Sequence, residues 1–141
     1  MENKTSSKEY NKNIDLTFNC VEYFDTLGIE VLEFKDGNSI LKLPFDNKLR
    51  QPFGIMHGGA LYSLADGACA FALLSTIKEL KPFVTVEMKI NYLEPVSSGD
   101  TFAYAKVLRE GRVVPIEVEL KNYGKLVAKA ISTYIILDSK K

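Results

Sequence analysis

Apolar and polar side chains alternate along most of the C-terminal half of the chain. In the first of four strand-like segments Val84, Val86, Met88, Ile90 and Tyr92 alternate with polar residues, and Ile116, Val118 and Leu120 do the same in the third. A period of two residues is typical of a strand with one covered face and one wetter face. We therefore predict four strands with short connections, forming an antiparallel meander, over residues 83–93, 101–110, 113–121 and 126–137.

Two earlier apolar segments, residues 29–34 and 40–45, flank a predicted turn. The dipeptide Asp36-Gly37 lies between them and tolerates the positive φ angles of a tight hairpin, so we predict two antiparallel strands. A short helix is expected before them, over residues 15–27. Residues 1–13 are polar and are expected to form a flexible tail ahead of a single domain over residues 14–141.

The segment from residue 58 to about residue 80 is predicted to form one long helix. It is too long for a strand, has few β-branched residues and ends close to Pro82, which stops a helix. Ten of the eighteen residues from 58 to 75 are Gly, Ala or Ser, so other elements can approach this helix closely. The order of elements predicts an α+β fold, with an antiparallel sheet wrapped around a buried central helix.

Composition and charge narrow the class of protein. The chain has 141 residues, the length of one domain, with 18 Lys plus Arg against 18 Asp plus Glu. A net charge of zero argues against a nucleic-acid binder, which needs positive charge to displace counterions from phosphates. One histidine excludes a multi-histidine metal site, and two cysteines make no disulfide framework. No segment suits a signal peptide or a membrane span, so we expect a cytoplasmic protein without membrane insertion.

One loop brings reactive groups to the start of the predicted long helix. His57, Gly58 and Gly59 lead into the helix N-terminus, whose unpaired amides and positive dipole suit a carbonyl oxygen that gains negative charge. Asp66 lies two turns further along among apolar residues, where an unpaired carboxylate is costly and suits a general base or acid. A purely structural role fits as well, in which the glycines start a crowded helix and Asp66 caps a neighbouring strand or contacts solvent.

The pattern H-G-G-x-x-x-x-L-A-D, formed by residues 57–66, resembles a known family in this order of elements. It is similar to the hotdog-fold acyl-CoA thioesterases, in particular the phenylacetate-pathway and aryl-CoA thioesterase group. The likeness extends over residues 51–137 and includes residues 84–95 (VTVEMKINYLEP) and Gly99-Asp100. It implies a hotdog fold, in which an antiparallel sheet wraps around one long helix.

The resemblance also implies roles for individual residues. Asp66 matches the catalytic carboxylate, which acts as a general base on water or as a nucleophile. Gly58 matches the residue whose amide polarises the thioester carbonyl, and His57 matches the histidine that orders the loop and the thioester. Gln51 stands where the family has an Asn or Gln that positions water or the substrate carbonyl. Thr85 falls where some members hold the water with a hydroxyl.

Further residues are candidates for substrate binding. Glycine at position 59 allows a ligand to approach the backbone, and Tyr62 and Ser63 precede Asp66 on the same helix, where both also suit packing. The segment Gln51-Pro52-Phe53-Gly54 resembles bacterial aryl-CoA thioesterases, which generally have Glu at the acid position. Asp66 instead resembles the phenylacetate type. The acyl group therefore stays open between aromatic and aliphatic.

The sequence thus predicts an acyl-CoA thioesterase that needs no cofactor. The resemblance implies a homodimer, pairing into a homotetramer, with each site shared between two chains. Two other functions are open: a non-catalytic protein that binds acyl-CoA or fatty acyl groups, and a dehydratase or hydratase of the same fold. A mere binder has no need of a carboxylate beside the thioester, and a hydratase would use a histidine near the acyl β-carbon, whereas His57 lies in the loop before the helix.

Overall fold

The computed structural model describes residues 21–138, which form one six-stranded sheet and a long central helix. The expected tail and the start of the expected first helix lie outside the described residues. None of the helices within residues 21–138 is long and apolar enough to cross a membrane. The elements, in chain order, are α2 (Glu22–Leu27), β1 (Glu30–Lys35), β2 (Asn38–Pro44), the 3-10 helix η1 (Asn47–Leu49), α3 (Gly58–Leu74), β3 (Phe83–Tyr92), β4 (Asp100–Val107), β5 (Val113–Asn122) and β6 (Lys125–Ile136).

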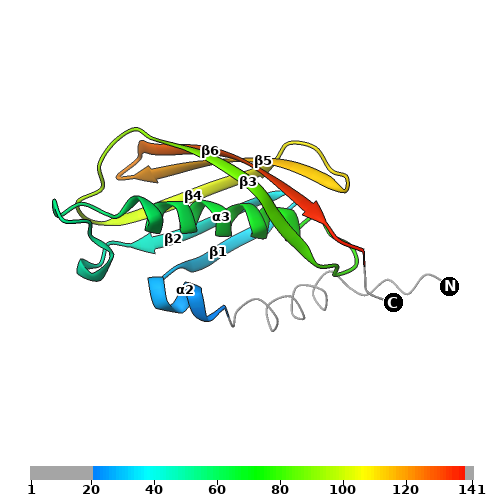
Figure 1. Ribbon diagram of the computed structural model, residues 1–141, viewed down its shortest axis with the longest axis horizontal. Helices are drawn as coiled ribbons and strands as arrows, with labels where there is room; N and C mark the ends of the chain where they lie inside the picture. Colours follow the sequence, from blue (N-terminus) through cyan, green and yellow to red (C-terminus); the bar gives the residue numbers. More distant parts are fainter. Residues whose placement is uncertain (1–20, 139–141) are drawn as a thin grey trace.

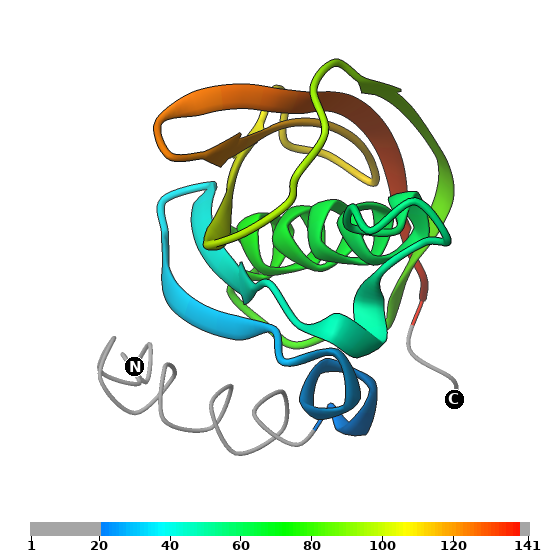
Figure 2. The same cartoon turned by 90° about the vertical axis from the view of Figure 1, so that its left-hand side faces the viewer.

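The sheet curls around α3. Its strands are ordered β1-β2-β4-β5-β6-β3, and every neighbouring pair is antiparallel. Seen along the helix, the strands enclose α3 on three sides, and α2 lies on the side that the sheet leaves open (Figures 1 and 2). The arrangement confirms the predicted α+β fold with a sheet around one helix.

Small residues on α3 let its neighbours approach closely. Along one line of the helix Ala65, Ala68 and Ala72 are fully buried, and a Cβ added at Gly67 would lie 2.6 Å from the ring of Phe24 in α2. Large apolar side chains from the inner face of the sheet fill the space around them, including Leu41, Leu43, Val114, Ile116, Val118 and Leu120. Because close packing maximises dispersion contacts, a thin helix inside a curled sheet makes one continuous core.

The central helix is shorter than predicted. It ends at Leu74 rather than near residue 80, because the next two side chains bond back to the helix. Ser75 donates its hydroxyl proton to the carbonyl of Ala72, and Thr76 donates to Leu73. Side-chain hydroxyls that bond local carbonyls compete with continuation of the helix. Pro82, which we expected to stop the helix, instead precedes β3.

The expected four-strand meander holds for only three strands. β4, β5 and β6 are consecutive neighbours, but β3 pairs with β6 and β4 pairs with β2. The connection over residues 93–99 passes across the end of α3, so β3 closes the opposite edge of the sheet (Figure 2). Short connections predicted sequential pairing, but enclosing the helix requires this crossover.

A β-bulge changes which side chains of β3 face the helix. The register with β6 shifts between Thr85 and Glu87, so the alternation is interrupted at Val86. Thr85 lies opposite the buried Tyr134 and faces inward, whereas Val86 is 58% exposed. Met88 is the next residue to face inward. The predicted apolar face, which grouped Val84 and Val86 with Met88, is therefore wrong at its first two positions.

The predicted hairpin is confirmed and its turn is tied to the central helix. Asp36 and Gly37 have φ angles of 51° and 80°, as a two-residue hairpin turn requires. The amide of Gly37 then donates to the hydroxyl oxygen of Ser75 at 2.8 Å. The β1–β2 turn and the C-terminus of α3 thus share one side chain.

We expect Ser75→Ala to lower the free energy of unfolding by about 1–2 kcal/mol, because it leaves the Gly37 amide without its acceptor. Urea denaturation measures this change. Thr76→Val is the matched control, since within residues 21–138 the Thr76 hydroxyl bonds only to Leu73 at the helix end and its loss should matter less. An unfolding midpoint of Ser75→Ala equal to that of the wild type would contradict the role of this contact.

Candidate active site

His57 caps the N-terminus of α3 with its side chain. Its Nδ1 accepts a hydrogen bond from the amide of Gly59 at 2.8 Å, and its carbonyl accepts from Ala60 at 3.0 Å. An accepting Nδ1 carries no proton, which leaves Nε2 as the nitrogen that can donate. Within residues 21–138 the amide of Gly58 has no acceptor. The positive end of the helix therefore presents one free N–H group.

The loop before His57 is held by its own hydrogen bonds. The amide of Gln51 donates to Ile55 at 2.8 Å, the amide of Gly54 donates to Gln51 at 3.0 Å, and the side-chain oxygen of Gln51 accepts from the amide of Phe53. Phe53 is 90% exposed at the tip. Because the loop is bonded within itself, it holds Gln51 at a fixed place beside the helix entrance.

Gln51 and Gly58 line the same cavity, which has a volume of about 430 Å³. The hydroxyl of Tyr92 donates to the carbonyl of Gly58 at 2.8 Å and connects β3 to the helix entrance. The other lining residues are mostly apolar: Ile55, Met56, Leu61, Leu93, Glu94, Pro95 and Val96. This cavity places the free amide of Gly58 beside an apolar surface.

Asp66 lies in the middle of α3 and bonds to two strands. Its Oδ1 accepts from the hydroxyl of Thr85 on β3 at 2.9 Å and from the hydroxyl of Tyr134 on β6 at 2.5 Å. The bulge in β3 is what turns Thr85 toward the helix. No hydrogen bond or ion pair engages Oδ2 in the described part of the chain. One carboxylate oxygen is anchored and the other is free.

Tyr134 is the site residue that sequence reasoning missed. It is 2% exposed and also donates to the backbone carbonyl of Asp66 at 2.8 Å. Burial first, and then the neighbouring Asp66 carboxylate, raise the pKa of its phenol well above the ordinary value. The sequence does contain a signal: after the small inward residues Ala130 and Ser132 of the last strand, the next inward position holds a large tyrosine.

The predicted catalytic residues form two groups within one chain. Thr85 lies with Asp66, and Gln51 lies with Gly58. Asp66 follows Gly58 by eight positions, a rise of about 12 Å along a helix. A reacting carbonyl must lie about 3 Å from both its oxyanion donor and its nucleophile or base. One chain therefore does not bring the two groups to a single carbonyl.

The three predicted substrate-binding residues have partners within the chain. The amide of Gly59 bonds His57, and the hydroxyl of Ser63 donates to Gly59 at 2.9 Å and contacts the hydroxyl of Tyr23 at 2.7 Å. The hydroxyl of Tyr62 donates to Met88 of β3 at 3.3 Å. These contacts fit the packing roles of Tyr62 and Ser63, and binding of substrate by the three residues stays a prediction.

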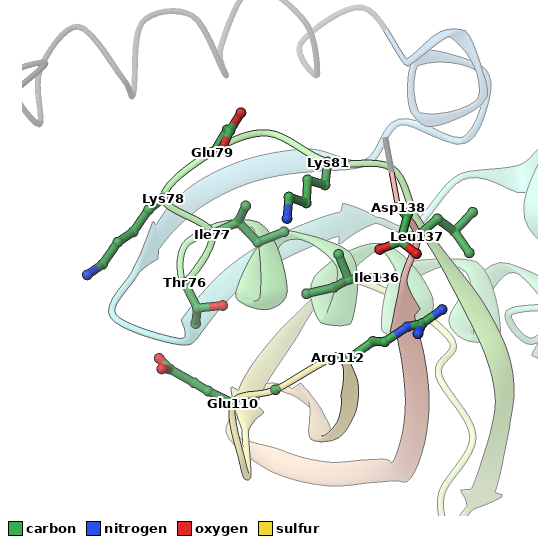
Figure 3. Close-up of a pocket in the computed structure, with 11 residues that line it drawn as sticks. Thr76, Ile77, Lys78, Glu79, Lys81, Glu110, Arg112, Ile136, Leu137 and Asp138 are labelled. Carbon is green, nitrogen blue, oxygen red and sulfur yellow. The ribbon is translucent and has the colours of Figure 1, made fainter. Parts of the chain in front are cut away.

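A larger cavity, of about 480 Å³, lies at the other end of α3. It includes Lys81, Glu110 and Arg112 but none of the predicted site residues. In Figure 3 Lys81 extends into it above Ile136, whereas Glu110 points away. Cationic and anionic side chains line this cavity together. Although it is larger, its lining does not mark it as the reactive site. Within residues 21–138 no cluster of three or more His, Cys, Asp or Glu could hold a metal ion.

Comparison with known proteins finds relatives that share the fold and part of the sequence. Conserved protein PA5202 of Pseudomonas aeruginosa is 37% identical, with a TM-score of 0.79 over 82% of this chain and 93% of that one. Phenylacetic acid degradation protein PaaI of Thermus thermophilus, solved as a mutant, is 29% identical, with a TM-score of 0.76 over 82% of this chain and 99% of that one. Human acyl-coenzyme A thioesterase 13 is 29% identical over 109 residues, which are 74% of this chain and 77% of that protein.

The family assignment follows from the matched segment. Residues 53–128, more than half of the chain, match the family model of the thioesterase superfamily. This segment contains α3 and β3, the strand that brings Thr85 and Tyr92 to the helix. The antiparallel sheet around one helix confirms the expected hotdog fold. The chain belongs to the thioesterase superfamily.

Proposed function

We propose that the protein hydrolyses an acyl-CoA thioester to a free carboxylic acid and coenzyme A, without a metal or redox cofactor. The observation that carries the proposal is Asp66, a carboxylate on a buried helix that two hydroxyls hold by one oxygen, leaving Oδ2 free. The free amide of Gly58 supplies the other half of the chemistry. Membership of the thioesterase superfamily and the similarity to acyl-coenzyme A thioesterase 13 support the substrate class.

In the proposed reaction the thioester carbonyl oxygen accepts a hydrogen bond from the Gly58 amide. Oδ2 of Asp66 takes a proton from water as the water oxygen bonds to the carbonyl carbon, and the positive end of α3 stabilises the resulting oxyanion. When the carbonyl re-forms, the C–S bond breaks and coenzyme A leaves as a thiolate, a good leaving group. Direct attack by Asp66, followed by hydrolysis of the mixed anhydride, gives the same products and uses the same groups.

The neighbouring residues have supporting roles in this proposal. Gln51 lies beside Gly58 and orients the substrate carbonyl or the water. The Thr85 hydroxyl donates to Oδ1 of Asp66 and so lies beside the carboxylate that holds the water. His57 orders the helix entrance through its bond to Gly59. The apolar cavity beside Gly58 is compatible with aromatic and aliphatic acyl groups.

We further propose that a second copy of the chain completes each site. Asp66 and Gly58 are about 12 Å apart along α3, too far to act on one carbonyl, so the Gly58 and Gln51 of one chain must meet the Asp66 of another. β3 is a ten-residue edge strand with Val84 and Val86 about half exposed. Long exposed edges tend to be paired or covered, and two-fold dimers are the commonest soluble oligomers. A tetramer of such dimers is the larger assembly that we expect.

Asp66→Asn removes the charge and keeps the size, so the protein should fold while kcat falls by about 100-fold or more. Thiol release from a panel of aliphatic and aryl CoA esters, followed by spectrophotometry, identifies the best substrate and measures this loss. Asp36→Asn, in the exposed hairpin turn, is the control and should keep wild-type activity. Folded Asp66→Asn with near wild-type turnover would overturn the mechanism.

Two substitutions test whether His57 acts through its cap. His57→Ala removes the acceptor of the Gly59 amide and should lower the free energy of unfolding by about 1 kcal/mol, with a loss of activity. His57→Asn offers another good cap, so it should recover both stability and most of the activity. Recovery of stability without recovery of kcat would instead assign the imidazole a direct contact with substrate.

Complementation tests the shared site. Asp66→Asn chains and Gln51→Ala chains, unfolded and refolded together, should form mixed dimers with one intact site. About a quarter of wild-type activity is expected, because half of randomly formed dimers are mixed and each has one of its two sites intact. Light scattering checks the oligomeric state. A monomer at micromolar concentration, or a mixture no more active than the average of its parents, would contradict the shared site.

A further inference from the structure

Tyr134 makes an unusual pair of contacts with a single residue of the central helix. From the inner face of β6, its hydroxyl reaches both the backbone carbonyl of Asp66, at 2.8 Å, and the carboxylate oxygen Oδ1. The ring is buried and packs near Phe83, with ring centroids 6.0 Å apart. Ala130 and Ser132, its inward neighbours on the strand, are small. The phenol of Tyr134 is thus a large polar group that extends from β6 toward the helix.

Packing alone does not account for the hydroxyl. A phenylalanine would bury the same ring without the cost of removing a polar group from water. That cost is offset here mainly through Asp66, whose carbonyl and carboxylate both accept from the Tyr134 hydroxyl, with the Thr85 hydroxyl also in contact with it. We therefore attribute the tyrosine at this position to the hydrogen bond that its hydroxyl donates to the Asp66 carboxylate.

We propose that Tyr134 is a positioning residue that, together with Thr85, holds Oδ1 of Asp66 so that Oδ2 is the oxygen that reacts. The two hydroxyls come from different strands and bind the same oxygen, and Tyr134 also holds the backbone of the same residue. The carboxylate is fixed relative to its own helix. The catalytic consequence rests on the function proposed above, whereas the fixation itself does not.

The groups around Asp66 are neutral hydrogen-bond donors and a neutral thiol. Burial, followed by the Asp66 charge, raises the pKa of Tyr134, so its phenol stays protonated and acts as a donor. Burial, followed by the same charge, raises the pKa of Cys69 on α3, whose thiol stays neutral. Thr85 from β3 does not titrate, and none of the four ion pairs among residues 21–138 includes Asp66. Hydrogen-bond donors, rather than a cation, stabilise the carboxylate.

Tyr134→Phe tests the proposal by removing only the hydroxyl. We expect kcat to fall by about 10- to 100-fold with KM little changed, because a hydrogen bond to a charged group is lost. The acidic limb of the pH–rate profile should move to higher pH, since the carboxylate loses a hydrogen-bond donor. Tyr104→Phe is the matched control: this strand tyrosine is exposed, its ring lies under Lys121, and its hydroxyl has no hydrogen bond within residues 21–138. Tyr104→Phe should change neither kcat nor the position of the acidic limb.

A measurement without substrate separates this proposal from the proposed function. Carboxyl carbon-13 NMR follows the titration of Asp66, assigned by the signal that Asp66→Asn removes. In Tyr134→Phe the midpoint should move to higher pH. If it moves while the wild type hydrolyses no acyl-CoA, the thioesterase function fails and the fixation of the carboxylate stands. An unchanged midpoint and an unchanged pH–rate profile in folded Tyr134→Phe would overturn the proposal.

A second measurement covers failure of Tyr134→Phe to fold. The buried hydroxyl proton of Tyr134 should give a downfield proton signal in the wild type, because it bonds a carboxylate. In Asp66→Asn, which retains the backbone acceptor, this signal should move upfield. A hydroxyl signal at the same position in both proteins would contradict the contact with Oδ1.

Discussion

Enclosure of α3 by the sheet limits where any polar group on that helix can find a partner. Hydroxyl and carbonyl groups that face the strands are shielded from water, so they must bond to the strands. Ser39 of β2 meets the carbonyl of Ala68 at 2.6 Å, and Tyr134 of β6 meets the carbonyl and the carboxylate of Asp66. The packing that stabilises the fold is therefore the same packing that fixes the candidate catalytic group. A site built in this way is preorganised by secondary structure rather than by a flexible loop.

Local chemistry made part of the fold predictable. The Asp36-Gly37 turn, the alternation in β5 and the start of the long helix at Gly58 depend on a few adjacent residues, and the structure agrees with all three. The pairing of β3 with β6 joins segments about 45 residues apart and depends on how the sheet closes around the helix. The early end of α3 depends on hydroxyls at Ser75 and Thr76, which a search for proline or glycine overlooks.

The residues of the candidate site likewise divide into those that the local sequence predicts and those whose role depends on the fold. Asp66 and Gly58 stand out in the sequence because a carboxylate and a glycine pair are unusual on a buried helix. Tyr134 is marked in the sequence only by its size among small inward residues, and its role exists only once β6 lies beside β3 in the observed register. The same holds for the separation of Gln51 and Gly58 from Asp66: a linear motif groups the residues together, while helix geometry spreads them along the axis.

The bulge in β3 has a consequence for how this strand can vary. Every residue before Val86 owes its orientation to the one extra position there, including the threonine that reaches Asp66. With Met88 facing inward, a regular strand over the same residues would turn Thr85 to the outer face and bring Val84 inward. The bulge instead leaves the two consecutive residues Val86 and Glu87 exposed and keeps Thr85 inward. The selective constraint at this point therefore acts on the path of the backbone rather than on the side chain of Val86: a substitution that straightens the strand without changing its length would turn the threonine away from Asp66.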